Sequence, residues 1–174
     1  MELEHLEPIV IGDGETGTAV TIDPVTGLEI SPVADLRNPF AAIDDPVRLR
    51  QIAIEIAEFA HGKHSRQGAE QLLDAAKAVL AGEEGAVEAE AQLRERFANG
   101  VFTASWLGVK LGDPFAGTLM ACHALGREPR DAADGALRNA IIMADLHRKM
   151  TGESIREELE ALVWRLVVSS AGGH

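Results

Sequence analysis

The most constraining stretch of the chain is residues 97–126, which read FANGVFTASWLGVKLGDPFAGTLMACHALG. Within it only Lys110 and Asp113 carry a formal charge at neutral pH. A membrane-spanning helix needs about 20 consecutive apolar residues, but Lys110 and the Gly-Asp-Pro sequence after it divide this stretch into two shorter halves. The pattern therefore predicts two short apolar helices, at 101–111 and 114–125, that form a central hairpin buried by the flanking helices.

Apolar residues recur at helical spacing through most of the remaining chain, as Leu49, Ile52 and Ile56 do near its start. Such periodicity is typical of amphipathic helices, and the Gly and Pro residues between periodic segments mark helix ends. The predicted fold class is mainly α, a bundle of six to seven helices around the central hairpin. The other helices are expected at 46–61, 66–81, 83–98, 130–149 and 154–168.

Capping signals predict several helix ends. Asp44 or Asp45 is expected to cap the first helix, because a side-chain oxygen at that position accepts a hydrogen bond from a free backbone N–H. Gly62 is expected to end that helix, and Ser65 to cap the second. Ser154 begins a Ser-x-x-Glu capping box before the last helix.

The N-terminal quarter differs from the rest. We predict an acidic β-hairpin arm and connector at 1–44 and an α-helical domain at 45–174. Alternating β-branched residues followed by an Asp-Pro-Val-Thr-Gly turn predict a β-hairpin at 18–31, with 9–11 as a candidate third strand. A hairpin this small is marginally stable alone, so we expect it to pack on the helices, another subunit or a partner.

The negative charge is concentrated in this N-terminal segment. The net charge is −12, and residues 1–45 contain ten acidic side chains but only one basic one, Arg37. Residues 46–174 are close to balance, with 18 acidic and 15 basic side chains. Binding to nucleic acid or to an anionic membrane is disfavoured, because phosphates attract a basic surface. We expect a protein partner or self-association, with these acidic residues as candidate contacts: Asp13, Glu15, Asp23 and Glu29.

Composition favours a self-sufficient core in a reducing compartment. At 174 residues and 46% apolar content, the chain is long enough to form a core without disulfides or metals. Its one cysteine, Cys122, excludes an intramolecular disulfide. The first residues, MELEHLEP, are acidic where a secretory signal would be basic. We therefore expect a cytoplasmic protein.

Glu55, Glu58, His61 and His64 recur at intervals of three residues. Glu-x-x-His is the inward-facing ligand pair of carboxylate-bridged di-iron helix bundles. However, the chain contains no second Glu-x-x-His, and a spacing of three drifts around the helix instead of keeping one face. We favour a solvated helix face, expect no cofactor, and keep Glu58, His61 and His64 as the metal-ligand candidates.

Gly12-x-Gly14-x-x-Gly17 matches the dinucleotide-binding fingerprint. That mechanism requires a helix N-terminus after the glycines to hold the pyrophosphate, whereas a strand and a turn are predicted here. Asp13 and Glu15 would also repel phosphate, and their spacing does not match an EF-hand calcium loop. We favour an acidic glycine turn.

Several residues with chemical potential have simpler structural interpretations. Cys122 and His123 are adjacent, so on a helix they point about 100° apart and cannot act together as a dyad. Cys122 lies in an apolar run, which raises a thiol pKa. His147 continues an apolar stripe and is expected to be half-buried and hydrogen-bonded. Trp106 is expected in the core, and Trp164, at the edge of an apolar face, is a candidate partner contact.

Two function classes follow. The favoured hypothesis is a non-enzymatic interaction or assembly module whose acidic arm binds a protein partner or another subunit; an immunity or inhibitor protein for a basic toxin is an alternative. The other alternative is a small helical ligand-binding protein or enzyme. Its pocket would lie beside the 101–125 hairpin, lined by Thr103, Ser105, Thr118, Cys122 and His123. We expect no catalytic residue, because no nucleophile–base pair meets the geometric criteria.

Overall fold

The computed structural model describes residues 9–11, 20–22, 29–30, 39–40, 42–66, 68–97 and 112–172. From residue 39 on, the described chain is mainly helical, which confirms the predicted class. Its helical segments are α1 (Pro46–Lys63), α2 (Ala69–Leu80), a stretch at 86–97, α4 (Pro114–Ala124), α5 (Pro129–Thr151) and α6 (Arg156–Gly172).

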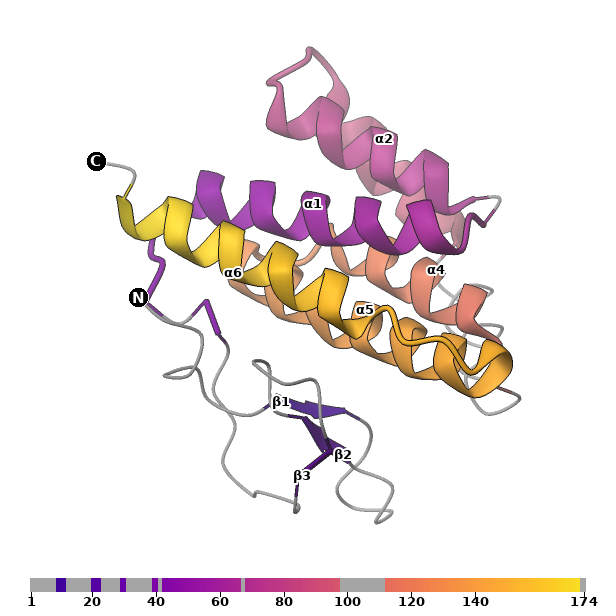
Figure 1. Ribbon diagram of the computed structural model, residues 1–174. Helices are drawn as coiled ribbons and strands as arrows, with labels where there is room; N and C mark the ends of the chain where they lie inside the picture. Colours follow the sequence, from indigo (N-terminus) through magenta and orange to yellow (C-terminus); the bar gives the residue numbers. More distant parts are fainter. Residues whose placement is uncertain are drawn as a thin grey trace.

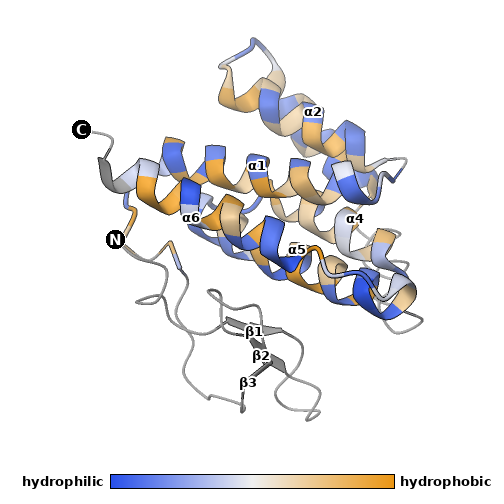
Figure 2. Ribbon diagram, viewed as in Figure 1, coloured by the Kyte–Doolittle hydropathy of each residue, from blue (hydrophilic) through white to orange (hydrophobic). Residues whose placement is uncertain are grey.

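The helices pack around α5. Helices α1 and α5 run side by side in the same direction, and α4 and α6 run the opposite way (Figure 1). The most extensive contacts of α5 are with α1 and α4, and α2 packs on α1 and α4. Hydrophobic and hydrophilic residues alternate along these helices (Figure 2), and among the hydrophobic ones Phe40, Ile52, Ile56 and Met143 are fully buried.

The predicted central hairpin is described in its second half only. That half is α4, and most of its side chains are buried, as an apolar helix enclosed by its neighbours requires. Its buried Thr118 hydroxyl donates a hydrogen bond to the Ala60 carbonyl of α1 at 3.2 Å. The first half, predicted at 101–111, lies outside the described residues. In the described part of the chain, no helix combines the length and apolar character needed to cross a membrane.

Of the caps predicted for the first two helices, one is confirmed and the other is wrong. Asp45 caps α1, and its carboxylate accepts a hydrogen bond from the Val47 N–H at 3.0 Å. The prediction for Ser65 is wrong, because its hydroxyl donates to the His61 carbonyl one turn back. Helix α2 begins after Gly68, whose φ of 91° favours glycine.

The ends of the first and last helices also differ from expectation. Gly62 does not end α1, which continues through Lys63 to a C-cap at His64. The Ser154 hydroxyl accepts from the Arg156 N–H at 3.4 Å, so it does lie at the start of α6. Helix α6 extends to Gly172, beyond the predicted end at residue 168.

Three short strands precede the helices. They are β1 (Ile9–Ile11), β2 (Val20–Ile22) and β3 (Glu29–Ile30), paired antiparallel in the order β1-β2-β3. The rest of residues 1–38 lies outside the described residues. The β-hairpin arm and the division at residue 44 therefore stay predictions.

The crossing of α4 and α5 can be tested at Gly117. A Cβ there would lie 2.8 Å from the backbone nitrogen of Met143, so Gly117→Ala must push the two helices apart. We expect a loss of about 1–3 kcal/mol in the free energy of unfolding, the range for an overpacked core, measured by urea denaturation.

Gly62→Ala is the matched control. Gly62 lies in the last turn of α1, and a Cβ added to it would meet no heavy atom within 4 Å. Alanine should stabilise the helix there by up to about 1 kcal/mol. If Gly117→Ala is also neutral or stabilising, the close approach of α4 and α5 is incorrect.

Candidate functional site

The connector to the acidic N-terminal segment is anchored to the helical body by Arg130 of α5. The Arg130 guanidinium donates to the carbonyl of Phe40 at 3.1 Å and to that of Ile43 at 2.7 Å. It also lies 3.5 Å from the exposed carboxylate of Asp44. Because the Phe40 side chain is fully buried, the acidic segment joins the helices at a defined point near the start of α5.

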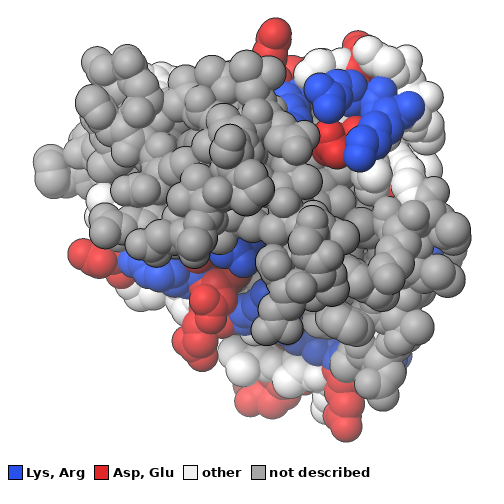
Figure 3. Space-filling view, turned by 90° about the horizontal axis from the view of Figure 1, so that it is seen from below, with Lys and Arg blue, Asp and Glu red and all other residues white. Residues whose placement is uncertain are grey.

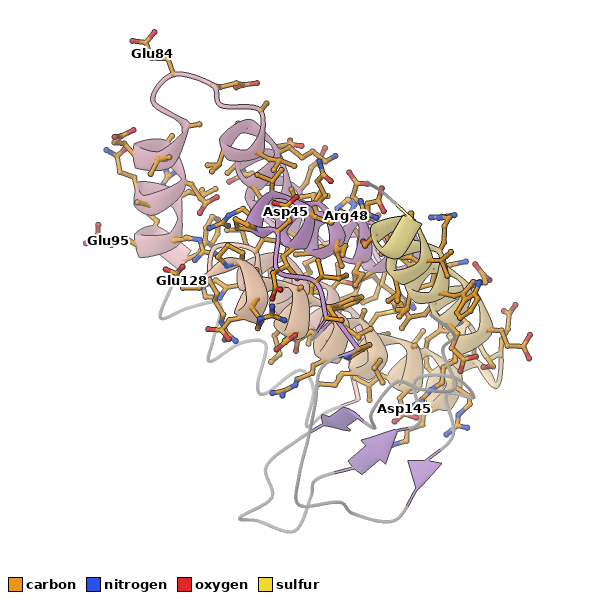
Figure 4. The ribbon with its side chains drawn as sticks, turned by 90° about the vertical axis from the view of Figure 1, so that its left-hand side faces the viewer. Asp45, Arg48, Glu84, Glu95, Glu128 and Asp145 are labelled. Carbon is orange, nitrogen blue, oxygen red and sulfur yellow. The ribbon has the colours of Figure 1, made fainter. Side chains whose placement is uncertain are left out.

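A cleft of about 570 Å³ lies beside this anchor, between the connector, the first turns of α1 and the C-terminal part of α6. Asp45 and Arg48 lie near one another at the start of α1 (Figure 4). Other residues that line the cleft are Ile43, Val47, Gln51 and Val167. The volume is in the range of small-molecule sites.

Arg48 is the basic group of this cleft, and α6 holds it in place. Its guanidinium donates to the hydroxyls of Ser170 at 2.8 Å and Ser169 at 2.6 Å, and to the Leu166 carbonyl at 3.2 Å. Arginine is favoured at such a position because Ser169 and Ser170 lie in the last turn of α6, where the helix dipole favours a positive charge. With Asp45 opposite in charge, the cleft suits a small molecule that carries both a hydrogen-bond acceptor and a cationic group.

A second cleft, of about 460 Å³, lies between α1 and α6. Its walls include Glu55, Glu58, Glu158 and Arg165, with Phe59 as an apolar element. Glu58 is ion-paired with Lys77 and Glu158 with Lys63. Most of the acidity in this cleft is therefore neutralised within the chain.

Of the residues predicted for a pocket beside the hairpin, the described ones, Thr118, Cys122 and His123, line neither cleft. Thr118 and Cys122 are fully buried, and burial raises the pKa of the Cys122 thiol to about 12. His123 is half-buried. Thr103, Ser105 and Trp106 lie outside the described residues, so the pocket beside the hairpin stays a prediction.

The metal-ligand candidates are directed to different neighbours. Glu58 pairs with Lys77 of α2, while the ring of His64 bonds to His147 of α5. His61 is half-buried near the end of α1. Among the described residues, no group of three or more His, Cys, Asp or Glu side chains is arranged to hold a metal ion.

The contact between His64 and His147 was not anticipated. His64 Nε2 lies 2.7 Å from His147 Nδ1, and the edge of Phe115 meets the His64 ring with centroids 5.0 Å apart. Burial lowers the pKa of His64, and the neighbouring His147 lowers it further, against the opposing field of Asp113. The apolar stripe indicated that His147 is partly buried, but no local signal in the sequence identified its partner.

Arginines from two other segments meet the C-terminal end of α4. Arg50 of α1 donates to the Leu125 carbonyl at 3.3 Å, and Arg94 donates to the His123 carbonyl at 2.6 Å. These bonds satisfy carbonyls that the helix leaves without partners. Burial lowers the pKa of His123, and the positive charges of Arg94 and Arg127 add to this effect.

The corner between α5 and α6 is held by Asp145, which has three basic neighbours. Its carboxylate lies 3.2 Å from Arg148, 3.3 Å from Lys149 and 3.4 Å from the buried Arg156. Figure 4 shows Asp145 toward the opposite end of the body from Asp45. A single carboxylate therefore links three basic side chains from α5 and α6 at this corner.

The candidate partner contacts are only partly described. Trp164 is half-buried on α6. Glu29 belongs to β3, of which only the backbone is described, and Asp13, Glu15 and Asp23 lie outside the described residues. Their role in binding stays a prediction.

No known family model, curated protein or solved structure matches this chain. The case for a function therefore depends on the residues of this chain alone.

The anchor of the N-terminal connector is testable at Arg130. Arg130→Met removes both hydrogen bonds to connector carbonyls, and bonds from charged donors are worth about 1.5–3 kcal/mol when buried. Since Arg130 is partly exposed, we expect a loss of about 1–2 kcal/mol in the free energy of unfolding and faster proteolysis at residues 39–45. Arg138→Met, at an exposed position on the same helix, is the control. It should change neither the free energy of unfolding nor the rate of proteolysis at residues 39–45. If the two variants give the same values, Arg130 does not anchor the connector.

Proposed function

We propose that this protein is a non-enzymatic interaction or assembly module in which the acidic N-terminal segment binds a protein partner. One observation carries the proposal: residues 1–45 hold nine of the twelve net negative charges of the chain. The anchor of Phe40 and Arg130 supports it, because it joins this segment to the helical body at a defined point.

The charge distribution of the body adds support. Many of its exposed charges are paired with one another, as in Lys63–Glu158, Lys77–Glu58 and the group around Asp145. Basic and acidic side chains of the described residues lie next to one another where Figure 3 shows them. Paired charges contribute little at a distance, so the N-terminal segment dominates the field that an approaching molecule meets.

This field favours a basic partner over a second copy of the chain. Contact between two acidic segments would be repulsive, and residues 46–174 are themselves slightly acidic. A basic protein would be attracted from solution and bound with a strong dependence on salt. A basic toxin, with this protein as its immunity protein or inhibitor, is one partner of that chemistry; another subunit remains an alternative.

Charge reversal tests the proposal. One variant carries Asp13→Lys, Glu15→Lys, Asp23→Lys and Glu29→Lys. Its control makes the same change in net charge in the helical body, at four exposed positions: Glu83, Glu84, Glu88 and Glu95. Glu84 and Glu95 point away from the body (Figure 4). Both variants and the unmodified chain are used for affinity capture from the native host with quantitative mass spectrometry.

We expect the unmodified chain and the control to capture a basic protein. The amount captured by the N-terminal variant should be at least tenfold lower. The captured protein is then titrated by calorimetry at two salt concentrations, where affinity should fall as salt rises. Equal capture by both variants would contradict the proposal. Native mass measurement of all three proteins tests the self-association alternative.

A second candidate function is binding of a small molecule, favoured by the 570 Å³ cleft at the start of α1. Ala42 is exposed and lines this cleft, so Ala42→Trp should fill it without disturbing the core. We expect a zwitterionic or cationic metabolite to raise the melting temperature of the unmodified protein and not of Ala42→Trp. If every compound acts equally on both proteins, the cleft is not a binding site.

A further inference from the structure

Two histidines separated by 83 residues in sequence meet where three helix ends converge. The C-terminal ends of α1 and α5 and the N-terminal end of α4 lie together at this corner (Figure 1). His64 is the C-cap of α1, His147 lies in the last turns of α5, and Phe115 of α4 covers the His64 ring. The proposed function does not use this pair.

The hydrogen bond between His64 and His147 can form only when one of the two facing ring nitrogens carries a hydrogen and the other does not. At 2.7 Å, the contact between His64 Nε2 and His147 Nδ1 is a hydrogen bond that needs one hydrogen between two nitrogens. Each neutral imidazole has one N–H and one lone pair, so two neutral rings satisfy this requirement. When both rings are protonated, each facing nitrogen carries a hydrogen, so the bond is lost and two like charges oppose each other.

Water has little access to the two rings, so it cannot stabilise a second positive charge there. His64 is 7% exposed. His147 Nε2 is buried and has no hydrogen-bond partner in the described structure, so when both nitrogens of His147 carry a hydrogen, the one on Nε2 lacks an acceptor. A charged ring at this corner is therefore poorly compensated.

We propose that the contact between His64 and His147 is a pH-sensitive latch, which holds the ends of α1 and α5 together at neutral pH and releases them when the pair takes up protons. An unfolded or opened chain can protonate both rings independently, whereas the closed corner cannot. Acidification therefore favours the open form by mass action on protons.

The charged groups around the corner do not replace the lost bond. Asp113 at the start of α4 is the acidic group whose field favours a charged His64, but its carboxylate is also 3.6 Å from Arg66. Lys63 of α1 is paired with Glu158 of α6, and Arg148 and Lys149 of α5 share the carboxylate of Asp145 with Arg156 of α6.

The sign of the pH dependence follows from the direction of the His64 shift. Its pKa is lowered in the folded protein from an ordinary value of 6.5. The stability of the corner is therefore complete above about pH 6.5 and is lost as pH falls from there toward the folded pKa. Each additional proton bound by the open form changes the opening equilibrium by about tenfold per pH unit.

Amide hydrogen exchange and ring NMR on the full chain test the latch. Exchange, corrected for its intrinsic pH dependence, is compared at pH 7.5 and pH 5 in peptides covering residues 60–66, 144–151 and, as an internal reference, α2. We expect protection at the first two segments to fall by about tenfold or more relative to α2. Ring nitrogen spectra should show His64 titrating below its ordinary pKa.

Glutamine variants separate the latch from general acid sensitivity. His64→Gln/His147→Gln cannot titrate and should show no acid-induced loss of protection at the two helix ends. His61→Gln is the control, since it removes a histidine from the same end of α1 and should behave like the unmodified protein. The readout is the difference between variants, because other groups also titrate in this pH range. Burial lowers the pKa of His123, and it raises the pKa of Asp134 to about 6.

Two results would overturn the latch. One is titration of His64 at or above its ordinary pKa in the unmodified protein, a measurement that does not depend on whether any variant folds. The other is acid-induced opening in the double variant equal to that in His61→Gln. Either result leaves the pair as a static packing contact.

Discussion

The close approach of α4 to α5 is the constraint on which the rest of the helical body depends. At Gly117 there is no room for even one additional carbon atom against Met143. Helix α5 can be approached this closely because its buried face is rich in alanine, including Ala132, Ala136 and Ala140. This places α5 in the interior, with its start beside the N-terminal connector and its end beside the C-cap of α1.

Several arginine side chains in the body donate hydrogen bonds to backbone carbonyls, in addition to the arginines that pair with carboxylates. Arg48, Arg50 and Arg94 donate to carbonyls near the C-terminal ends of α6 and α4, where the helix dipole also favours positive charge. Arg130 does the same for the connector. These positive charges are therefore engaged with the backbone of the described residues, which fits the proposal that the N-terminal acidic residues bind a partner.

The proposed interaction and the proposed latch depend on different physics. Long-range attraction to an acidic segment is weakened by salt and needs no precise geometry. The histidine contact is short-range and responds to pH because it allows only particular proton arrangements. The two would therefore respond to different changes in the surroundings of the protein, and neither requires the other.

The helices and their mainly α class were predictable from the sequence, because apolar periodicity and caps such as Asp45 are local properties of the chain. Where local signals competed, the predictions of helix ends were wrong. The Ser65 hydroxyl donates back to the His61 carbonyl, and Gly62 continues α1, because glycine lowers helix stability without preventing helical geometry. The acid concentration in residues 1–45 was also evident without a structure. Only the tertiary structure brought His64 to His147 and Arg130 to the connector carbonyls, because such pairs depend on how helices pack across many intervening residues.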